Sequence, residues 1–496
     1  MNIRLAAIAF AIVFGSLCQS QSLVDFQKKV TEFTLANGLH FIIVERHDAP
    51  VVAFDTLANV GSVNDPGGKT GLAHMFEHMA FKGTAAIGSE NWPAEKQALG
   101  QIESDYDAVQ DAAAAELPEL QKKLEQDIEA AEKFVVPNLY TRIIEENGGV
   151  GLNAQTSNDS TEFYYKLPSN RIELWFLMES QRFLAPVFRE FYKERSVVLE
   201  ERRMRTESNP QGLLIEGFSA AAFEAHPYHN PPVGWASDVE HLRVGDAITF
   251  FKTYYVPSNL SIAIVGDVDP SAARRLAEKY FGMIPAGPPP PPVHTIEPPQ
   301  HGERDIRIVG QSQPMEVIGY RRPDEQSPDD AVLEVTADVL SSGRTGLIFK
   351  DLVEQKRVAL EAGAEPSFPG SKYANLFLLY IVPNQGKTLA DCEKPLLEVI
   401  DRLKTQKVDD VMLQRVKTKL RAELIGKLDG NAELASELNA YQVAYGDWRR
   451  LFTELDDIQK VTADDIQRAA IRYFIPDAMT VARLIPLPDE SAGAAQ

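Results

Sequence analysis

Near its beginning the chain carries the stretch Thr70-Gly71-Leu72-Ala73-His74-Met75-Phe76-Glu77-His78-Met79-Ala80-Phe81. An α-helix turns by about 100° per residue, so residues i, i+3 and i+4 share one face. In a helix, His74, Glu77 and His78 would therefore project to the same side. Two neutral imidazoles begin a zinc site, and a carboxylate between them can act as a base. The order His-x-x-Glu-His thus predicts a catalytic metal helix that needs one more ligand. The alternative is two surface histidines and a solvated glutamate.

The third ligand is expected to be a carboxylate on another helix. Residues 191–204 have a helical pattern, and Glu194 and Glu201 lie seven residues apart within it. Seven residues make nearly two turns, so both side chains project from one face, whereas Glu200 points about 100° away. We predict that Glu201 is the metal ligand and that Glu194 is a neighbouring carboxylate that orients ligands or substrate. Glu200 is expected to face solvent or an ion-pair partner.

With these motifs the chain resembles a known family. The metal helix, the Glu-x6-Glu pair and the intervening Gly-Leu-Asn-Ala-Gln-Thr-Ser segment resemble the pitrilysin-type inverzincin peptidases, which include insulin-degrading enzyme and the mitochondrial processing peptidase. The resemblance extends over nearly the whole chain and is strongest to the short bacterial two-domain members. It implies one zinc ion (Zn2+) per chain, bound by His74, His78 and Glu201. It also implies that Glu77 is the general base and that Glu194 is the family's auxiliary glutamate.

Substrate binding is expected beside the metal helix. Residues 161–167 are rich in aromatic and β-branched residues and predict a strand that follows the Asn-Ala-Gln-Thr stretch at 153–156. In the family that the chain resembles, this region forms an edge strand beside the zinc, and the peptide substrate adds to it as a further strand. The resemblance therefore implies Asn153 and Ala154 as substrate-binding residues. The residues alone leave open that Asn153 caps a turn and that the strand is internal.

Composition indicates an ordinary soluble globular protein with more than one core. The chain has 496 residues, of which 44% are hydrophobic and 24% charged, and this length exceeds what one domain usually holds. Its formal net charge of −21, without a lysine- or arginine-rich patch, argues against a nucleic-acid partner. Beyond the N-terminus no run approaches the roughly 20 apolar residues of a membrane helix, so no transmembrane anchor is expected.

The chain contains an internal repeat. Residues 254–263 match residues 473–482, and Asp246 and Asp465 precede the two copies at the same offset. Each copy is typical of a helix, a proline-marked break and a β-branched strand, although such junctions can also recur by chance. A proline run at 288–292 lies between the copies and predicts an extended spacer.

The repeat and the spacer predict two related domains, residues 23–284 and 300–488, joined by a linker over 285–299. The resemblance implies an α+β fold of the α/β-roll type. In it, two homologous domains, each a mostly antiparallel sheet packed with helices, face each other as a clamshell around the substrate. The second half lacks the metal motif and is expected to be a non-catalytic wall. A helical insertion at about 94–135 is expected to form a hairpin. Whether that hairpin covers the active-site mouth, contacts a partner or is simply solvated stays open.

The second half also departs from the family pattern. Self-sufficient relatives carry an Arg and a Tyr there, seven residues apart, which grip substrate and help to stabilise the oxyanion. The corresponding positions here hold Val353 and Leu360, which can donate neither charge nor hydroxyl. We therefore expect a homologous partner subunit to supply the missing Arg/Tyr pair, as in relatives composed of two different chains.

The first residues are expected to be a cleaved signal peptide. A basic start precedes an apolar run over residues 5–17, and cleavage before Gln21 would remove residues 1–20. The chain is therefore predicted to be periplasmic or secreted, with lipidation of Cys18 as an alternative. After cleavage only Cys392 remains, which excludes an intrachain disulfide and a cysteine-based zinc site.

Taken together, these features predict a zinc-dependent endopeptidase that cleaves unstructured peptides in an enclosed chamber, as the zinc-bearing subunit of a heterodimer. The alternative is a non-enzymatic subunit, similar to the core proteins of respiratory complexes, or a peptide-binding chamber that keeps zinc only for structure. His226 and His229 resemble a metal pair, but the prolines around them predict a loop without helical alignment. No metal is expected there.

Overall fold

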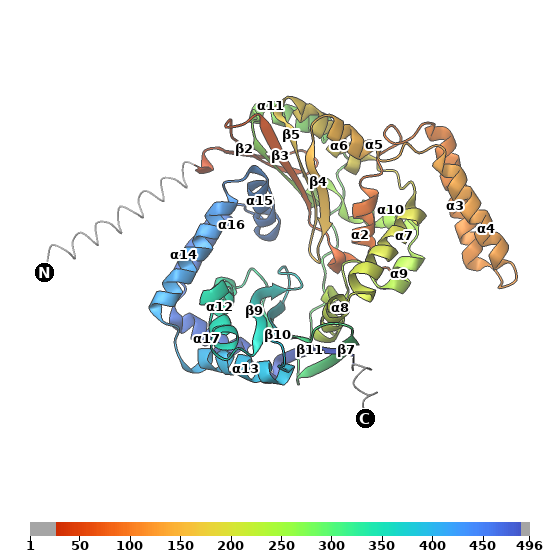
Figure 1. Ribbon diagram of the computed structural model, residues 1–496. Coiled ribbons are helices and arrows are strands. Elements are labelled where there is room, and N and C mark those ends of the chain that lie inside the picture. Colours follow the sequence, from red (N-terminus) through yellow and green to blue (C-terminus); the bar gives the residue numbers. More distant parts are fainter. Residues whose placement is uncertain (1–25, 488–496) are drawn as a thin grey trace.

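The computed structural model describes residues 26–487, which form two β-sheets and the helices around them (Figure 1). The first sheet has the strand order β1-β2-β6-β3-β5-β4 and the second the order β7-β11-β8-β10-β9. The strands of the first sheet are β1 (Val30–Thr34), β2 (His40–Glu45), β3 (Val51–Ala58), β4 (Val150–Thr156), β5 (Thr161–Pro168) and β6 (Leu260–Gly266). Those of the second are β7 (Arg304–Gly310), β8 (Met315–Arg322), β9 (Ala359–Phe368), β10 (Asn375–Pro383) and β11 (Met479–Pro486). The expected signal peptide and Cys18 lie outside the described residues.

The two sheets repeat one topology. β2 pairs in parallel with β6, and β7 pairs in parallel with β11. All other pairings in the two sheets are antiparallel. The order β2-β6-β3-β5-β4 thus matches β7-β11-β8-β10-β9, and the repeated segments 254–263 and 473–482 lead into the equivalent strands β6 and β11. The expectation of two related, mostly antiparallel sheets packed with helices is confirmed.

Helices cover both sheets, and the first half has more of them than the second. The first half contains α2 (Leu72–Met79), α3 (Trp92–Asp111), α4 (Leu117–Glu132), α5 (Leu139–Glu146), α6 (Ile172–Leu184), α7 (Phe191–Arg202), α8 (Pro210–Ala222), α9 (Ala236–His241), α10 (Val244–Tyr254) and α11 (Pro270–Tyr280). The second half contains α12 (Asp330–Ser341), α13 (Leu389–Thr405), α14 (Asp410–Lys427), α15 (Asn431–Tyr445), α16 (Arg450–Lys460) and α17 (Ala463–Tyr473). None of the helices in the described chain combines the length and the apolar character needed to cross a membrane.

The metal helix α2 is seated in the aromatic core of the first half. Phe76 of α2 is fully buried, with its ring centroid 3.9 Å from that of Tyr255. Leu72 and Met79, on the same helix, are buried as well. Burying such side chains contributes about 1.5–3 kcal/mol each, so the apolar side of α2 fixes the direction in which its histidines project.

Each half also contributes one helix to the sheet of the other. Phe218 of α8 is fully buried in one cluster with Val317 of the second sheet. In return, Leu434 of α15 is fully buried in a cluster with Ile42 of the first sheet. Separating the two sheets would therefore expose two apolar layers to water, which costs roughly 25 cal/mol for each Å². We call this arrangement the helix exchange.

The strand at the edge of the first sheet differs from the expectation. β5, which contains residues 161–167, is internal because it lies between β3 and β4. The expectation that this strand forms the edge was wrong. The edge strand beside β5 is β4, which carries Asn153 and Ala154 and has a partner strand on one side only within residues 26–487. Glycine, asparagine and alanine have low strand propensity, so the pattern of β4 did not predict a strand.

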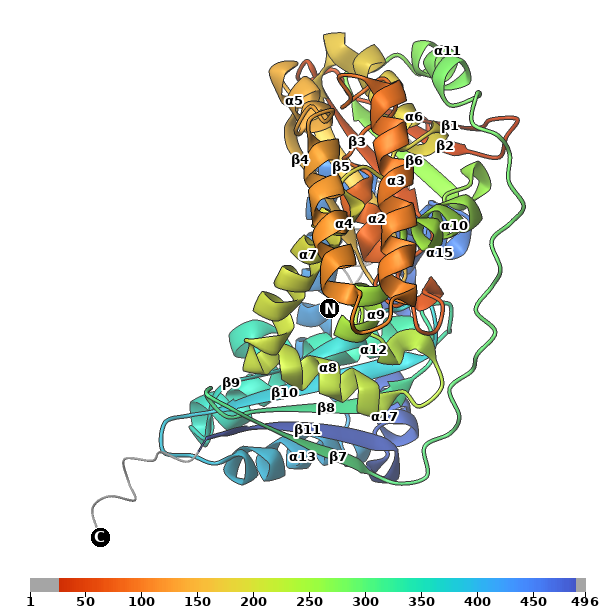
Figure 2. The same ribbon diagram turned by 90° about the vertical axis from the view of Figure 1, so that its right-hand side faces the viewer.

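Two segments lie outside the sheet layers. α3 and α4 form a helical hairpin that stands off the body (Figures 1 and 2). Residues 285–303 contain no helix or strand and run along the outside of the molecule towards β7 (Figure 2). Glu297 fastens this linker, because its carboxylate accepts hydrogen bonds of 2.8–2.9 Å from the backbone N–H groups of residues 224–226. The same carboxylate lies 2.9 Å from the guanidinium of Arg321.

Candidate metal centre

Asp65 and Gly71 define the start of the metal helix. The two carboxylate oxygens of Asp65 accept hydrogen bonds from the backbone N–H groups of Gly71 and Ala73, at 2.7 and 2.9 Å. Gly71 has a φ of +90°, and a Cβ there would come 2.8 Å from the carbonyl oxygen of Val233. Glycine is therefore required at this position. These contacts hold the first turn of α2 in place, and the last of them lies one residue before His74.

His74, His78 and Glu201 converge on one point. Glu201 Oε1 lies 3.7 Å from His74 Nε2, and Glu201 Oε2 lies 3.5 Å from His78 Nε2. One donor atom from each residue lies within 4.8 Å of the other two. Among residues 26–487, no other group of three or more histidine, cysteine, aspartate or glutamate side chains meets this criterion.

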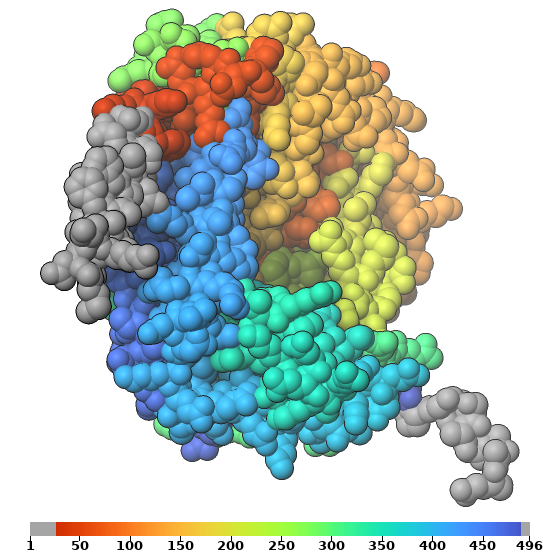
Figure 3. Space-filling model, turned by 60° about the vertical axis from the view of Figure 1, so that its left-hand side comes forward, coloured from red at the N-terminus to blue at the C-terminus, as the bar shows by residue number. Residues whose placement is uncertain are grey.

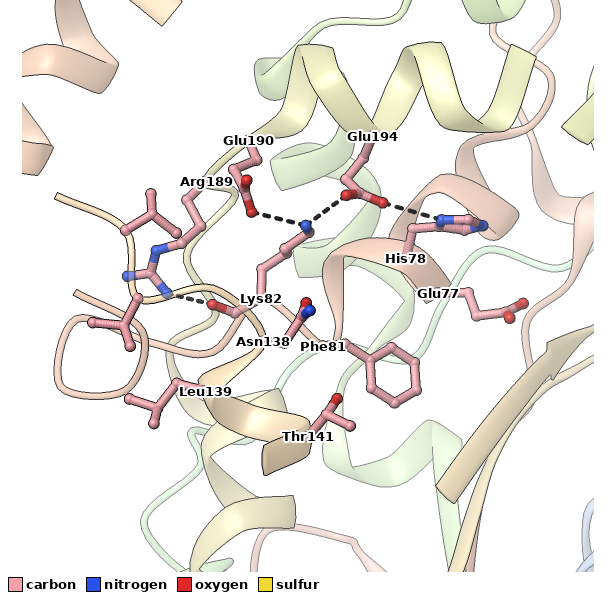
Figure 4. A pocket seen from close by; sticks show the side chains of 12 residues that line it. Glu77, His78, Phe81, Lys82, Asn138, Leu139, Thr141, Arg189, Glu190 and Glu194 are labelled. Carbon is pink, nitrogen blue, oxygen red and sulfur yellow. Dashed lines mark hydrogen bonds and ion pairs between the residues drawn. The ribbon is translucent and has the colours of Figure 1, made fainter. Parts of the chain in front are cut away.

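Glu194 contacts the outer face of this group. Its Oε2 lies 3.3 Å from His78 Nδ1, and its Oε1 accepts a hydrogen bond from Lys82 Nζ at 2.5 Å (Figure 4). Lys82 also donates to Glu190 at 2.9 Å. Burial raises the pKa of Glu194, but the hydrogen bonds from His78 and Lys82 outweigh it and lower the pKa to about 2. Glu194 is therefore ionised and orients the imidazole of His78.

Glu77 contacts the edge strand. Thr156 of β4 donates a hydrogen bond from its hydroxyl to Glu77 Oε2 at 2.5 Å. Burial, assisted by the charge of Glu201, raises the pKa of Glu77, although this hydrogen bond and the charges of His78 and Arg205 act in the opposite direction. Nothing in the sequence singled out Thr156, because the contact depends on how β4 is placed against α2.

The chemistry of this donor set fits a zinc ion. Both imidazoles present Nε2 to the Glu201 carboxylate, and at 3.5 and 3.7 Å the contacts exceed the usual hydrogen-bond length. Two imidazole nitrogens and one carboxylate oxygen form a common ligand set of catalytic zinc sites. The contact between His78 Nδ1 and Glu194 leaves His78 Nε2 free to act as a ligand. His74, His78 and Glu201 could therefore hold the metal.

The remaining candidate residues are placed as follows. Asn153 is exposed on β4 and donates from Nδ2 to the Tyr164 hydroxyl at 3.3 Å, and Ala154 lies beside it with 8% exposure. Leu360 lies on β9 and is 57% exposed. Its side chain is apolar, so it presents no polar group there. His226 is buried at 3% exposure, and its Nδ1 accepts a hydrogen bond from its own loop backbone. This hydrogen bond agrees with a structural role for the loop that contains His226.

Of two cavities, one adjoins the candidate site and the other lies between the halves. One of about 260 Å³ is lined by Glu77, His78 and Lys82 and extends towards residues 135–141, which follow the helical hairpin (Figure 4). A second, of about 590 Å³, lies between the halves, with carboxylates of both among its lining residues. In the space-filling view a hollow opens between the blue and teal surface of the second half and the yellow surface of the first (Figure 3).

The amino-acid sequence matches two family models of known proteins. Residues 41–106 and 131–234 match the family model described as insulinase (peptidase family M16), and residues 241–420 match the model described as peptidase M16 inactive domain. The break in the first match, residues 107–130, falls within the hairpin of α3 and α4.

Several relatives are similar over most of their length. The chain is 27% identical over 491 residues to a protein of Helicobacter pylori named zinc protease PqqE, and the match covers 96% of each chain. It is 22% identical to a probable mitochondrial-processing peptidase subunit beta of Arabidopsis thaliana, over 92% of this chain and 78% of that one. A crystal structure of a protease from Helicobacter pylori matches with a TM-score of 0.77 and 25% identity, over 92% of this chain and 100% of that one.

Proposed function

The chain belongs to peptidase family M16, and on that premise we propose that it is a zinc-dependent endopeptidase that hydrolyses unstructured peptides in the hollow between its halves. The observation that carries the proposal is the convergence of His74, His78 and Glu201. Glu77 lies beside the two histidines on α2. Relatives named zinc proteases support a peptidase-type activity and zinc as the metal.

We assign His74, His78 and Glu201 as the metal ligands and Glu194 as the residue that orients His78. A zinc ion bound there would supply a Lewis acid that polarises the scissile carbonyl and increases the acidity of a water molecule. The negative charge of Glu201 and the two imidazoles, which bind a metal ion in their neutral form, match what such an ion requires.

Glu77 acts as general base and then as general acid. It takes a proton from the attacking water and passes it to the leaving amine. The burial that raises its pKa brings it closer to the range in which one carboxyl group can do both. The hydroxyl of Thr156 holds the Glu77 carboxylate in place during these transfers.

The free edge of β4 would bind the substrate. An extended peptide can pair with the unpaired backbone groups of an edge strand, and this pairing makes few demands on its side chains. Asn153 and Ala154 lie on this strand, and Thr156 on the same strand contacts the base. A peptide paired along β4 would therefore pass directly beside Glu77.

We further propose a partner and a location. Val353 and Leu360 leave the second half without the Arg/Tyr pair of self-sufficient relatives, and this supports a homologous subunit that supplies the pair. The apolar N-terminal run supports export to the periplasm or the medium. Hydrolysis that is no faster with such a subunit than without it would contradict the partner proposal.

The central proposal is tested by removing and restoring the metal. The purified protein should hydrolyse a fluorogenic, unstructured peptide, lose this activity after dialysis against a chelator, and regain it with stoichiometric zinc. A zinc-loaded protein that binds the peptide without cleaving it, with and without a homologous subunit, would instead identify a binding subunit. Activity that persists in the metal-free protein would refute the zinc mechanism.

A further inference from the structure

Arg205 places a positive charge directly at the candidate metal centre. Its Nη1 lies 2.7 Å from Glu201 Oε1, the same oxygen that lies 3.7 Å from His74 Nε2. The metal helix, the third ligand and this guanidinium surround the same point.

The backbone beneath Arg205 is held firmly. Arg205 lies in a π-helical turn, Arg203–Glu207, that continues α7 beyond Glu201. Such turns occur often at functional sites. On one side of the turn, Arg202 donates to both carboxylate oxygens of Glu216, at 2.7 and 3.0 Å. On the other side, α8 packs so closely that a Cβ at Gly212 would come 2.2 Å from the carbonyl oxygen of Arg205.

The side chain itself remains accessible. Arg205 is 76% exposed, whereas its partner Glu201 is 17% exposed. A guanidinium carries five N–H donors, and the one partner that the structure of residues 26–487 gives it is Glu201. The other donors are therefore available to bind an oxygen of a substrate that reaches the candidate metal centre.

An ion pair between residues i and i+4 of a helix is also common without any function. The same turn offers a direct comparison, because Arg203 pairs with Glu200 at 2.6 Å, and both side chains are about half exposed. Neither residue of that pair contacts His74, His78 or Glu201 among the interactions of residues 26–487. Arg205 differs from it in position, since its partner Glu201 is the assigned third ligand.

The chemistry of peptide hydrolysis requires such a group. Attack on the scissile carbonyl leaves a negative charge on its oxygen, and hydrogen-bond donors directed at that oxygen lower the barrier. Val353 and Leu360, in the second half, offer no donor. A guanidinium is permanently charged and presents several donors in a fixed plane.

We propose that Arg205 donates a hydrogen bond to the carbonyl oxygen of the scissile bond and stabilises the negative charge that develops there. This inference rests on the proposed function, since it assigns a residue to the same hydrolysis. It gives the first half a source of electrophilic support of its own, to which a partner subunit would add.

The test compares Arg205→Ala, Arg205→Lys and the matched control Arg203→Ala, each zinc-loaded and assayed on the same fluorogenic peptide. Arg205→Ala should lower kcat by about 100- to 1,000-fold, the usual cost of one lost oxyanion donor, and should leave KM and zinc content nearly unchanged. Arg205→Lys should recover part of kcat, and Arg203→Ala should match the wild type. Added guanidinium ion should raise kcat of Arg205→Ala but not of Glu77→Gln.

Further measurements distinguish a failure of the inference about Arg205 from a failure of the proposed function. A phosphinic peptide carries a charged tetrahedral group that mimics the oxyanion, and Arg205→Ala should bind it at least about 100-fold more weakly. A kcat of Arg205→Ala within about threefold of wild type would overturn the inference. So would a loss of activity that only follows a loss of zinc. If the wild type cleaves no peptide, the proposed function fails, and unchanged phosphinic-peptide binding would then overturn the inference separately.

Discussion

The two halves share their chain order and differ in what one equivalent pair of helices carries. In the first half β3 leads to α2, which packs against α7, and in the second half β8 leads to α12, which packs against α14. α2 and α7 present His74, His78 and Glu201. α12 and α14 instead present Asp338 and Lys419, whose charged atoms lie 2.9 and 3.2 Å apart. The same helix pair thus packs with an ordinary ion pair in the second half, which supports the proposal that His74, His78 and Glu201 are present for chemistry.

Of the substitutions that test this difference between the two helix pairs, His74→Ala is expected to have the largest effect. Losing one of three ligands should remove the zinc, and activity should fall by roughly 10⁴-fold or more because the Lewis acid is lost. The fold should persist, since α12 and α14 pack together without a metal. Zinc content, peptidase rate and far-UV circular dichroism are the measurements. Collapse of the secondary structure would show that the metal also maintains the fold.

Glu77→Gln should separate metal binding from turnover. The amide cannot accept the proton of the attacking water, so kcat should fall by about 10²–10⁴-fold, while zinc content stays at the wild-type level. Asp338→Asn, in the helix of the second half that is equivalent to α2, is the matched control and should keep full activity. Retention of wild-type turnover by Glu77→Gln would refute the role assigned to this carboxylate.

Phe218→Ala should show that the two halves unfold together. Removing this buried ring from the helix exchange should lower the free energy of unfolding by about 3–5 kcal/mol. Probes in both halves should report the same transition, because α8 belongs to the first half of the sequence and packs on the second sheet. Chemical denaturation followed by fluorescence and circular dichroism measures this. Val411→Ala, at a position that is 70% exposed, should change stability little. Two separate transitions in the wild type would contradict the coupling.

Glu316→Gln should have the smallest effect, and it depends on pH. Glu316 of β8 pairs with Arg483, whereas the equivalent register of the first sheet holds the apolar pair Phe54 and Ile264. Burial raises the pKa of Glu316 from 4.5 to about 7. The folded state thus holds this proton more tightly than the unfolded state, and the resulting stability is complete below pH 4.5 and is lost as pH rises to 7.

The variant should remove that dependence. Between pH 5 and pH 8, the wild type should lose more stability than Glu316→Gln, by roughly 1–3 kcal/mol. Arg483 keeps Asp305 and Glu393 as partners in the variant, so its charge is not left alone. Urea denaturation midpoints at the two pH values are the measurement. Equal pH dependence in both proteins would show that Glu316 does not titrate in this window.

The sequence predicted which residues share one face of a helix, because this follows from their spacing. It did not predict contacts between elements that are distant in the chain. The seven-residue interval brought Glu194 and Glu201 to one face, and Glu200 pairs with Arg203 at the surface, as its position on the helix predicts. Thr156 could not be foreseen, because it lies 79 residues from Glu77 and meets it only through the register of β4.

The helix exchange and the edge strand were missed for related reasons. α8 and α15 each have an apolar face, but periodicity does not say which sheet that face will cover. The strand β4 is poor in β-branched residues, and its place at the edge follows from pairing with β5 alone.

The helix exchange also determines what a cut in the chain would do. Residues 285–303 connect the two copies of the repeat, yet the hydrophobic layers beneath α8 and α15 hold those copies together without them. A protease that nicked this connection should leave both fragments in one particle that elutes as a single species. Neither fragment expressed alone could shield its own exposed layer, so each should aggregate unless the other is present.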